Sequence, residues 1–209
     1  MGVVELEKIT EEEFIFIEND NDPIDAPPGP YTIQPDVPGK ILWLSGAPGM
    51  GKSTSAQIMA REDGYVYYEA DCFSNLKNPY LPLDLDEPSM GQMKQKNLKG
   101  PGLKERGEIV KAGQQIFGEI MMEKEYDKAV FNKYYETMST DIRNEKKRIG
   151  GTFAIAHVVL SREARDTVRK VLGSDVVFIL LRMSTEDRRK RVLARHDGSE
   201  SAADLMDVS

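Results

Sequence analysis

The stretch GAPGMGKST, which runs from Gly46 to Thr54, constrains this chain more than any other part of it. It lies between two segments that favour burial. The residues before it, 41–45, are ILWLS, an apolar run typical of a strand that is covered on both faces. The residues after it, 54–60, are rich in helix formers and have apolar side chains three and four positions apart. A strand, a tight glycine turn and a helix start form the setting in which G-x-x-x-x-G-K-[ST] predicts a phosphate-binding loop.

The glycines of this stretch explain how it would bind phosphate. Gly46, Gly49 and Gly51 let the backbone curl so that successive N–H groups point into one concavity, beside the positive end of the helix dipole. We expect Lys52 to bridge the outer phosphates of a nucleotide and the Ser53 hydroxyl to bind Mg²⁺. The residues predicted to bind the nucleotide are Gly46, Ala47, Pro48, Gly49, Met50, Gly51, Lys52, Ser53 and Thr54.

Length and composition predict one soluble globular domain. The 209 residues are 40% hydrophobic. No apolar run approaches the roughly 20 residues that cross a bilayer. The first residues are acidic, which indicates neither a secretory signal nor a transit peptide. Because Cys72 is the single cysteine, the sequence predicts no internal disulfide and suits a reducing compartment. We therefore expect a cytoplasmic protein without a membrane partner.

The acidic charge is concentrated near the N-terminus. Residues 1–39 contain ten acidic side chains and one basic side chain, Lys8, whereas the whole chain has a formal net charge of −7. Residues 40–209 therefore carry +2, which gives no support for a nucleic-acid partner. The N-terminal segment is also rich in proline and holds one candidate for a short strand, at 14–17. We divide the chain into an acidic, proline-rich segment, 1–39, and a domain that spans 40–209.

From residue 40 onward the apolar patterns alternate between strand and helix. Strands are expected at 40–45, 65–71, 152–160 and 175–183. Helices are expected at about 52–62, 103–124, 161–173 and 185–196, with 125–150 helical in part. Ser161 is the expected cap of one helix, and Ser184 or Thr185 that of the last. This alternation predicts a three-layer α/β domain with a mainly parallel sheet flanked by helices.

Polar side chains follow the predicted strands. Because ligands of open parallel sheets bind beyond the carboxyl ends of the strands, the phosphate loop, Glu69 and Asp71 are expected to converge. We expect Asp71 to hold the hydroxyl of a phosphate acceptor and to take its proton, and Glu69 to contact the acceptor or to bind Mg²⁺ through water. The alternative for both is an exposed strand end without a chemical role. His157 lies within an apolar run, so we expect a hydrogen-bonded core histidine.

Arginines recur at helical spacing near the end of the chain. Arg188, Arg191 and Arg195 are three and four residues apart, so they share one face of the expected helix. Phosphoryl transfer needs cationic groups over the developing charge, and the fixed donors of arginine suit that role. A solvated basic face that balances nearby acidic residues is the alternative.

The order of these motifs resembles that of the gluconate kinase and shikimate kinase branch of the small P-loop kinases, which lies near adenylate kinase. The segments that carry the resemblance are GAPGMGKST, Glu69-Ala70-Asp71, LKGPGLKER at 98–106 and the stretch 158–196. The resemblance implies a P-loop NTPase fold and a kinase that uses ATP and Mg²⁺ to phosphorylate a hydroxyl of a small polar metabolite, such as a sugar acid. It implies catalytic roles for Lys52, Asp71, Arg191 and Arg195, acceptor binding by Glu69, Asp71, Arg106 and Arg165, and metal binding by Ser53.

Departures from the family pattern leave other functions open. Glu69 and Ala70 stand where the family has Asp and Gly, and the sequence ends at Ser209, before the family's remaining lid, fifth strand and last helix. We therefore expect a short C-terminal part, with either the N-terminal segment in place of the missing strand or a truncated, inactive form. One alternative is a nucleoside monophosphate kinase, although its Asp-Gly-Phe-Pro-Arg stretch is missing. Another is an inactive nucleotide-binding module, in which 1–39 or 125–150 contacts a partner protein. A homodimer formed through the N-terminal segment is also expected as an alternative to a protein partner.

Overall fold

The computed structural model describes residues 15–18, 39–74, 79, 103–121, 125–159 and 161–195 of the chain. These residues contain one sheet of five strands: β1 (Ile15–Glu18), β2 (Ile41–Ser45), β3 (Val66–Glu69), β4 (Phe153–Ala156) and β5 (Val176–Arg182). The strand order is β1-β5-β2-β4-β3, and every neighbouring pair is parallel. The predicted α/β fold with a mainly parallel sheet is confirmed. Residues 75–78 and 80–102, which include the first part of LKGPGLKER, lie outside the described residues.

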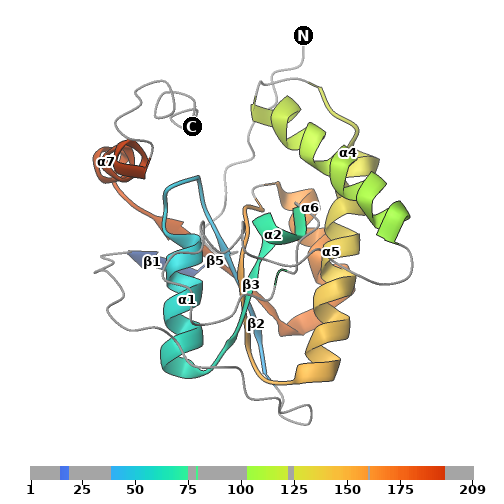
Figure 1. Cartoon of the computed structure of the whole chain (residues 1–209), viewed down its shortest axis with the longest axis horizontal. Helices are drawn as coiled ribbons and strands as arrows, with labels where there is room; N and C mark the ends of the chain where they lie inside the picture. The colour runs from blue at the N-terminus through green and yellow to red at the C-terminus, as the bar shows by residue number, and fades with distance from the viewer. Residues whose placement is uncertain are drawn as a thin grey trace.

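Helices connect the strands and cover both faces of the sheet (Figure 1). They are α1 (Lys52–Asp63), α2 (Ala70–Ser74), α4 (Leu103–Met121), α5 (Lys128–Ile149), α6 (Arg162–Leu172) and α7 (Thr185–Arg195), with a 3-10 turn, η2 (Gly173–Asp175), after α6. Apolar contacts place α1 on one face of the sheet and α4, α5 and α6 on the other. The sheet is therefore the middle layer of three, as the alternation of elements predicts.

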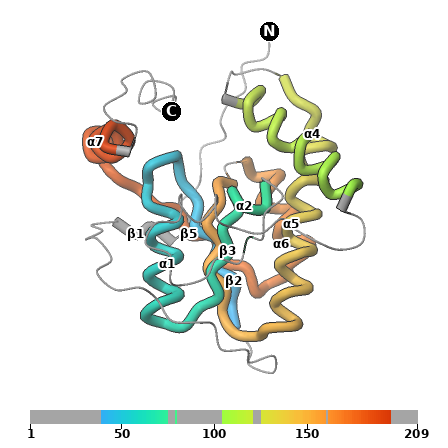
Figure 2. The backbone as a smooth tube through the Cα atoms, viewed as in Figure 1, coloured from blue at the N-terminus to red at the C-terminus, as the bar shows by residue number. Residues whose placement is uncertain are grey.

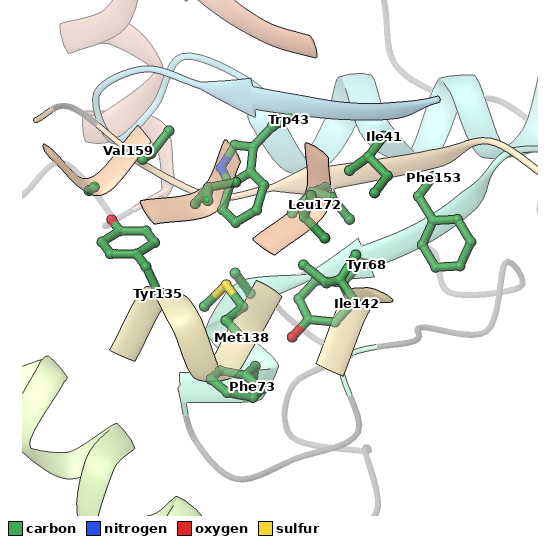
Figure 3. Packing of buried hydrophobic residues seen from close by; sticks show 14 of the residues in the cluster. Ile41, Trp43, Tyr68, Phe73, Tyr135, Met138, Ile142, Phe153, Val159 and Leu172 are labelled. Atoms are coloured by element: carbon green, nitrogen blue, oxygen red, sulfur yellow. The ribbon is translucent and has the colours of Figure 1, made fainter. Parts of the chain in front are cut away.

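Two apolar cores lie on the two sides of the sheet because successive strand residues point to opposite faces. On the side of α1, Leu44 and Tyr67 pack with Ala56 and Ala60 of that helix. On the other side, Trp43 and Tyr68 belong to a larger core that includes side chains of α4, α5 and α6. Figure 3 shows this larger core, with Trp43 and Ile41 of β2 facing Tyr135, Met138 and Ile142 of α5.

Trp43 anchors the larger core. It is fully buried, and its indole Nε1 donates a hydrogen bond of 3.2 Å to the carbonyl oxygen of His157. Its ring lies 6.5 Å from that of Tyr135 and 6.0 Å from that of Phe178, measured between centroids. The contacts join β2 to α5 and β5, so the strand that leads into the glycine turn is held from two directions.

Polar caps fix where the C-terminal helices begin and end. The Ser161 hydroxyl accepts a hydrogen bond of 3.1 Å from the N–H of Ala164, and Gly173 ends α6 with φ 71°. The Ser184 hydroxyl accepts one of 3.1 Å from the N–H of Asp187 at the start of α7. These are the expected caps. The two serine hydroxyls accept from N–H groups that have no partner within their helix, and Gly173 adopts a backbone angle that favours glycine.

Two predicted strands were too long. The strand expected at 65–71 ends at Glu69, and Asp71 lies in the first turn of α2. The strand expected at 152–160 ends at Ala156, which leaves His157 beyond it. The N–H of His157 still donates to the carbonyl oxygen of Leu44 in β2 at 3.2 Å. Two residues further on, the N–H of Val159 donates to the hydroxyl of Ser45 at 2.9 Å, so a side chain takes the place of the neighbouring strand there.

The segment expected to be helical only in part forms one helix of 22 residues, α5. Although most of its residues are polar, α5 has a stripe of buried apolar and aromatic residues spaced three and four positions apart. These are Phe131, Tyr134, Tyr135, Met138 and Ile142. The Asp127 carboxylate caps the helix by accepting from the N–H groups of Ala129 and Val130, at 2.9 and 3.2 Å. Packing against α4 and the sheet therefore selects a continuous helix.

The N-terminal segment contributes a strand to the sheet. β1 pairs in parallel with β5, in a register that sets Ile15 opposite Ile179 and Glu18 opposite Arg182. It forms the outer edge beyond β5, at the place where the sequence left an edge to be covered. Of the two arrangements expected there, the structure has the one in which the N-terminal segment provides the strand.

Within the part of the chain that the structure describes, no helix has both the length and the apolar character needed to cross a membrane.

Candidate active site

The glycine turn between β2 and α1 is shaped by three positive backbone angles. Gly46, Gly49 and Gly51 have φ values of 145°, 85° and 85°, a region that other residues rarely adopt. A Cβ atom at Gly46 would lie 2.9 Å from the carbonyl oxygen of Leu181, and one at Gly49 would lie 2.9 Å from Cγ2 of Val192. The loop therefore has the backbone form that its glycines predict, and its neighbours leave no room for side chains.

The Lys52 side chain folds back over this loop. Its Nζ donates hydrogen bonds of 2.9 Å to the carbonyl oxygen of Gly46 and of 3.0 Å to that of Ala47. Lys52 is also the first residue of α1, so its charge adds to the positive end of the helix dipole. The backbone N–H groups, the helix N-terminus and the ammonium together form a place for an anion. Nucleotide binding by this loop stays a prediction.

Ser53 joins the loop to the end of β3. Its side chain is hydrogen-bonded to the carboxylate of Glu69, which is 2% exposed. The Tyr67 hydroxyl donates to Oε2 of Glu69 at 2.7 Å, and the N–H of Asp71 approaches Oε1 at 3.4 Å. The sequence pattern predicts that these strand ends converge, and the structure brings them into contact.

The environment of Glu69 changes its acidity. Burial, followed by the negative charge of Asp71, raises the pKa of Glu69 from 4.5 to about 7. The hydrogen bonds from Ser53, Tyr67 and the Asp71 backbone act in the opposite direction, because they favour the charged carboxylate. A carboxyl group whose pKa is close to neutral pH is a common feature of functional sites.

Asp71 lies beside Glu69 but faces solvent. It is exposed and belongs to α2, a single turn of helix that follows β3 directly. Two contacts hold the other end of α2: Ser74 Oγ and Tyr134 Oη share a hydrogen bond of 2.6 Å, and Gln114 Nε2 donates to the Ser74 carbonyl oxygen at 2.5 Å. α4 and α5 thereby fix the turn that carries Asp71.

Arg106 lies close to the same turn. Its guanidinium group forms an ion pair of 3.1 Å with Oδ1 of Asp141 in α5 and lies 6.0 Å from the ring centroid of Phe73 in α2. Burial raises the pKa of Asp141, and the charge of Arg106 opposes that effect. Arg106 of α4 thus lies beside Phe73, which follows Asp71 by two residues in α2. A contact with an acceptor stays a prediction.

α7 lies on the side of the glycine loop between β2 and α1 (Figure 2), and one of its arginines packs against that loop. Arg188 is 7% exposed, and its Cγ would lie 3.4 Å from a Cβ placed at Gly49. Arg191 is half-buried, and the side chain of Arg195 lies outside the described residues. Of the three arginines expected to share one face of this helix, Arg188 is therefore the one that lies against the loop. The roles of Arg191 and Arg195 stay predictions.

Arg165 is buried in α6, at 2% exposure. Its backbone N–H donates to the carbonyl oxygen of Ser161 at 3.2 Å, as expected in the first turn of a helix. The predicted contact between Arg165 and an acceptor is not tested by this geometry and stays a prediction.

His157 lies in a cage of aromatic rings. Its ring centroid is 5.6 Å from those of Phe117 and Tyr135, 5.9 Å from that of Tyr134 and 6.2 Å from that of Trp43. Burial, and then the charge of Lys52, lowers the pKa of His157 from 6.5 to about 3. Its Nε2 has no hydrogen-bond partner among the described residues. His157 is the core histidine that the sequence predicts, but no described group binds that nitrogen.

The oxygen donors near the loop fit magnesium better than a metal held by protein alone. Among the residues that the structure describes, no three His, Cys, Asp or Glu side chains form a metal-binding group. Ser53 and Glu69 offer a hydroxyl and a carboxylate in contact with each other. Magnesium prefers such hard donors and takes the rest of its shell from phosphates and water, so this small set is sufficient.

No model of a protein family matches the chain, and no curated protein matches it. Similar solved structures include a gluconokinase from Sinorhizobium meliloti, with 16% identity and a TM-score of 0.46, covering 81% of this chain and 73% of that one. A sugar kinase from Janibacter sp. has 17% identity and a TM-score of 0.44, covering 82% of this chain and 80% of that one.

Proposed function

We propose that the chain is an ATP-dependent phosphotransferase that moves the γ-phosphate to a hydroxyl of a small polar metabolite, such as a sugar acid. The observation that carries the proposal is the contact between Ser53, in the glycine loop, and Glu69, with the exposed carboxylate of Asp71 two residues further on. A loop that only held a nucleotide with Mg²⁺ could use Glu69 but would need no second, exposed carboxylate beside it. Phosphoryl transfer needs both a phosphate cradle and a carboxylate that faces the acceptor.

The loop residues bind and orient the nucleotide in this proposal. The N–H groups of residues 46–54 hold the phosphate oxygens, and Lys52 leaves the carbonyl oxygens of Gly46 and Ala47 to reach the outer phosphates. Ser53 and Glu69 are the residues that would hold Mg²⁺. When bound, this ion supplies positive charge that neutralises the phosphates.

Asp71 is the proposed base. The proton of the acceptor hydroxyl passes to the Asp71 carboxylate as the acceptor oxygen forms its bond to the γ-phosphorus. The bond between that phosphorus and the bridging oxygen breaks, and ADP leaves with the electron pair. Because α2 is held by Tyr134 and Gln114, the carboxylate has a fixed position relative to the loop.

Arginines complete the proposed site. Arg191 and Arg195 stand in α7, the helix that packs on the loop, and are proposed to cover the phosphoryl group during transfer. Arg106, beside α2, and Arg165 are proposed to bind the acceptor. A sugar acid offers both the hydroxyl that Asp71 requires and a negative group for arginine.

The proposal is tested by comparing two Asp→Asn variants while ATP consumption is followed with a panel of sugar acids, polyols and nucleotides. Asp71→Asn is expected to lower the rate of transfer by about 100-fold or more, because the base is lost, and to leave ATP affinity almost unchanged. Asp63→Asn, which alters an exposed carboxylate in the last turn of α1, is the matched control and should keep the wild-type rate. Tight ATP binding without turnover on any acceptor would instead support the inactive binding module.

A further inference from the structure

Two neighbouring tyrosines of β3 face opposite sides of the sheet. Tyr67 packs on the side of α1, and Tyr68 packs in the larger core beneath α5. Both are buried, at 1% and 0% exposure. Burying a phenol hydroxyl is costly unless it finds a partner, so the partner of each hydroxyl is informative about its role.

The Tyr67 hydroxyl binds the carboxylate of Glu69. The two residues are two positions apart on one strand, so their side chains lie on the same face. The hydroxyl donates to Oε2 at 2.7 Å, a short bond of the kind made to charged acceptors. Tyr67 itself packs in the smaller apolar core, which also contains Ala56 and Ala60 of α1. Its ring is therefore immobilised, and its hydroxyl fixes one oxygen of the carboxylate.

Glu69 also accepts a hydrogen bond from Ser53. A hydroxyl has one proton and two lone pairs. When that proton is donated to Glu69, the lone pairs of the Ser53 oxygen are free to face a cation. The orientation of Glu69 thereby decides whether Ser53 presents lone pairs or a proton toward the phosphates. Tyr67, in turn, holds Glu69 in that orientation.

We propose that Tyr67 is a positioning residue for magnesium: its hydroxyl holds the Glu69 carboxylate so that Ser53 presents its oxygen lone pairs to the metal. The inference rests on the proposed function, because it takes the ligand of the loop to be a nucleotide with Mg²⁺. Residues that orient metal ligands from behind typically change metal affinity by about 10- to 100-fold when they are removed. The competing explanation is that Tyr67 fills space in the core, as Tyr68 does on the other face.

Calorimetric titration with ATP separates the two explanations. ATP affinity is measured in EDTA and over a range of MgCl₂ concentrations for wild type, Tyr67→Phe and Tyr68→Phe. Tyr67→Phe keeps the ring and removes only the hydroxyl. It should leave the affinity in EDTA within about twofold of wild type and raise the Mg²⁺ concentration for half-maximal enhancement about tenfold. Tyr68→Phe removes the same group from the opposite face and should change neither value.

A second pair of variants tests whether Tyr67 acts through Glu69. Glu69→Gln should weaken the Mg²⁺ enhancement more than Tyr67→Phe does. Adding Tyr67→Phe to Glu69→Gln should change the Mg²⁺ dependence no further, since residues that act through one another are not additive. A double variant whose loss of Mg²⁺ enhancement equals the sum of the two single losses, in free-energy terms, would show independent action and overturn the inference.

The outcomes distinguish this inference from the proposed function. Wild-type protein that binds no ATP contradicts both. Wild-type protein that binds ATP with Mg²⁺ enhancement, combined with a Tyr67→Phe variant that behaves like Tyr68→Phe, contradicts the inference alone. A loss of affinity in EDTA as large as that in Mg²⁺ would show that Tyr67 supports the loop itself, which also contradicts it.

Discussion

Gly49 is packed against Val192, so that a Cβ at Gly49 would lie 2.9 Å from Cγ2 of that valine. The contact places α7 on the glycine turn although the two residues are far apart in the sequence. Any ligand of the turn therefore lies close to a helix that carries Arg188 and Arg191.

Gly49→Ala should destabilise the fold through this contact. The new methyl group meets both a positive φ of 85° and the Val192 side chain, so we expect a loss of about 2–4 kcal/mol in the free energy of unfolding. Gly64→Ala is the matched control, because Gly64 has φ 71° but open space around it, and it should lose about 1 kcal/mol. Urea unfolding measures both values. Equal losses would mean that α7 does not pack on the turn in solution.

The stability of the protein should depend on pH through Glu69 and His157, with opposite signs. The pKa of Glu69 is raised from 4.5 to about 7, so stability falls as pH rises through that window, when the unfolded state ionises first. The pKa of His157 is lowered from 6.5 to about 3, so stability falls as pH drops below 6.5, when the unfolded state takes up the proton. Between pH 4.5 and 6.5 the two effects oppose each other.

Single variants separate the contributions of Glu69 and His157 to the pH dependence of the unfolding free energy. Each contribution has a slope of about 1.4 kcal/mol per pH unit at most. In the window from pH 4.5 to 6.5, Glu69→Gln should lose stability as the pH falls, and His157→Phe should gain it. Chemical unfolding at half-unit intervals of pH gives these slopes relative to wild type. If Glu69→Gln has the wild-type slope, Glu69 ionises normally in the folded protein.

The hydrogen bond between Ser74 and Tyr134 should matter for turnover more than for nucleotide binding. Tyr134→Phe removes one partner of the 2.6 Å bond, which frees one end of α2. We expect a loss of about 1 kcal/mol in stability and a fall in kcat of about tenfold, because the Asp71 carboxylate is held less well. ATP affinity should not change. Ser74→Ala and the double variant complete a cycle, and additive effects on kcat would rule out action through this bond.

The N-terminal strand should be needed for a monodisperse protein. Deletion of residues 1–18 removes β1 and uncovers the edge of β5, so we expect a lower melting temperature and self-association. Deletion of residues 1–12 removes most of the acidic start but keeps the strand, and serves as the control. Thermal unfolding combined with sedimentation velocity measures both effects. A monomeric, fully stable protein without residues 1–18 would show that β1 is dispensable.

The parts of the fold that local sequence decides were predicted well. The glycine turn depends on backbone angles that only Gly46, Gly49 and Gly51 adopt easily, and the residues before and after it favour one strand and one helix. Helix caps such as Ser161 act within three residues of themselves, so their role is also visible in the sequence. Convergence of the loop and Glu69 followed from the parallel order of the strands.

Features that depend on distant contacts were predicted poorly or missed. Beyond the end of β4, the N–H of Val159 donates to the hydroxyl of Ser45, which is more than a hundred residues away in the sequence. The contact of Arg188 with the loop depends on how α7 packs, which its own sequence does not fix. The bond between Tyr67 and Glu69, by contrast, had a local signal that was overlooked: two polar groups two positions apart on a strand share a face.

The central claim is that this chain transfers a phosphoryl group, and ³¹P NMR of the reaction products tests it most directly. Wild-type protein is incubated with ATP, Mg²⁺ and the acceptor panel, and the spectrum is followed over time. We predict that ADP and a phosphomonoester appear in equal amounts with at least one acceptor, and that Asp71→Asn slows the appearance of both by about 100-fold or more. ATP that stays intact with every acceptor, or that yields only ADP and inorganic phosphate, would contradict the claim.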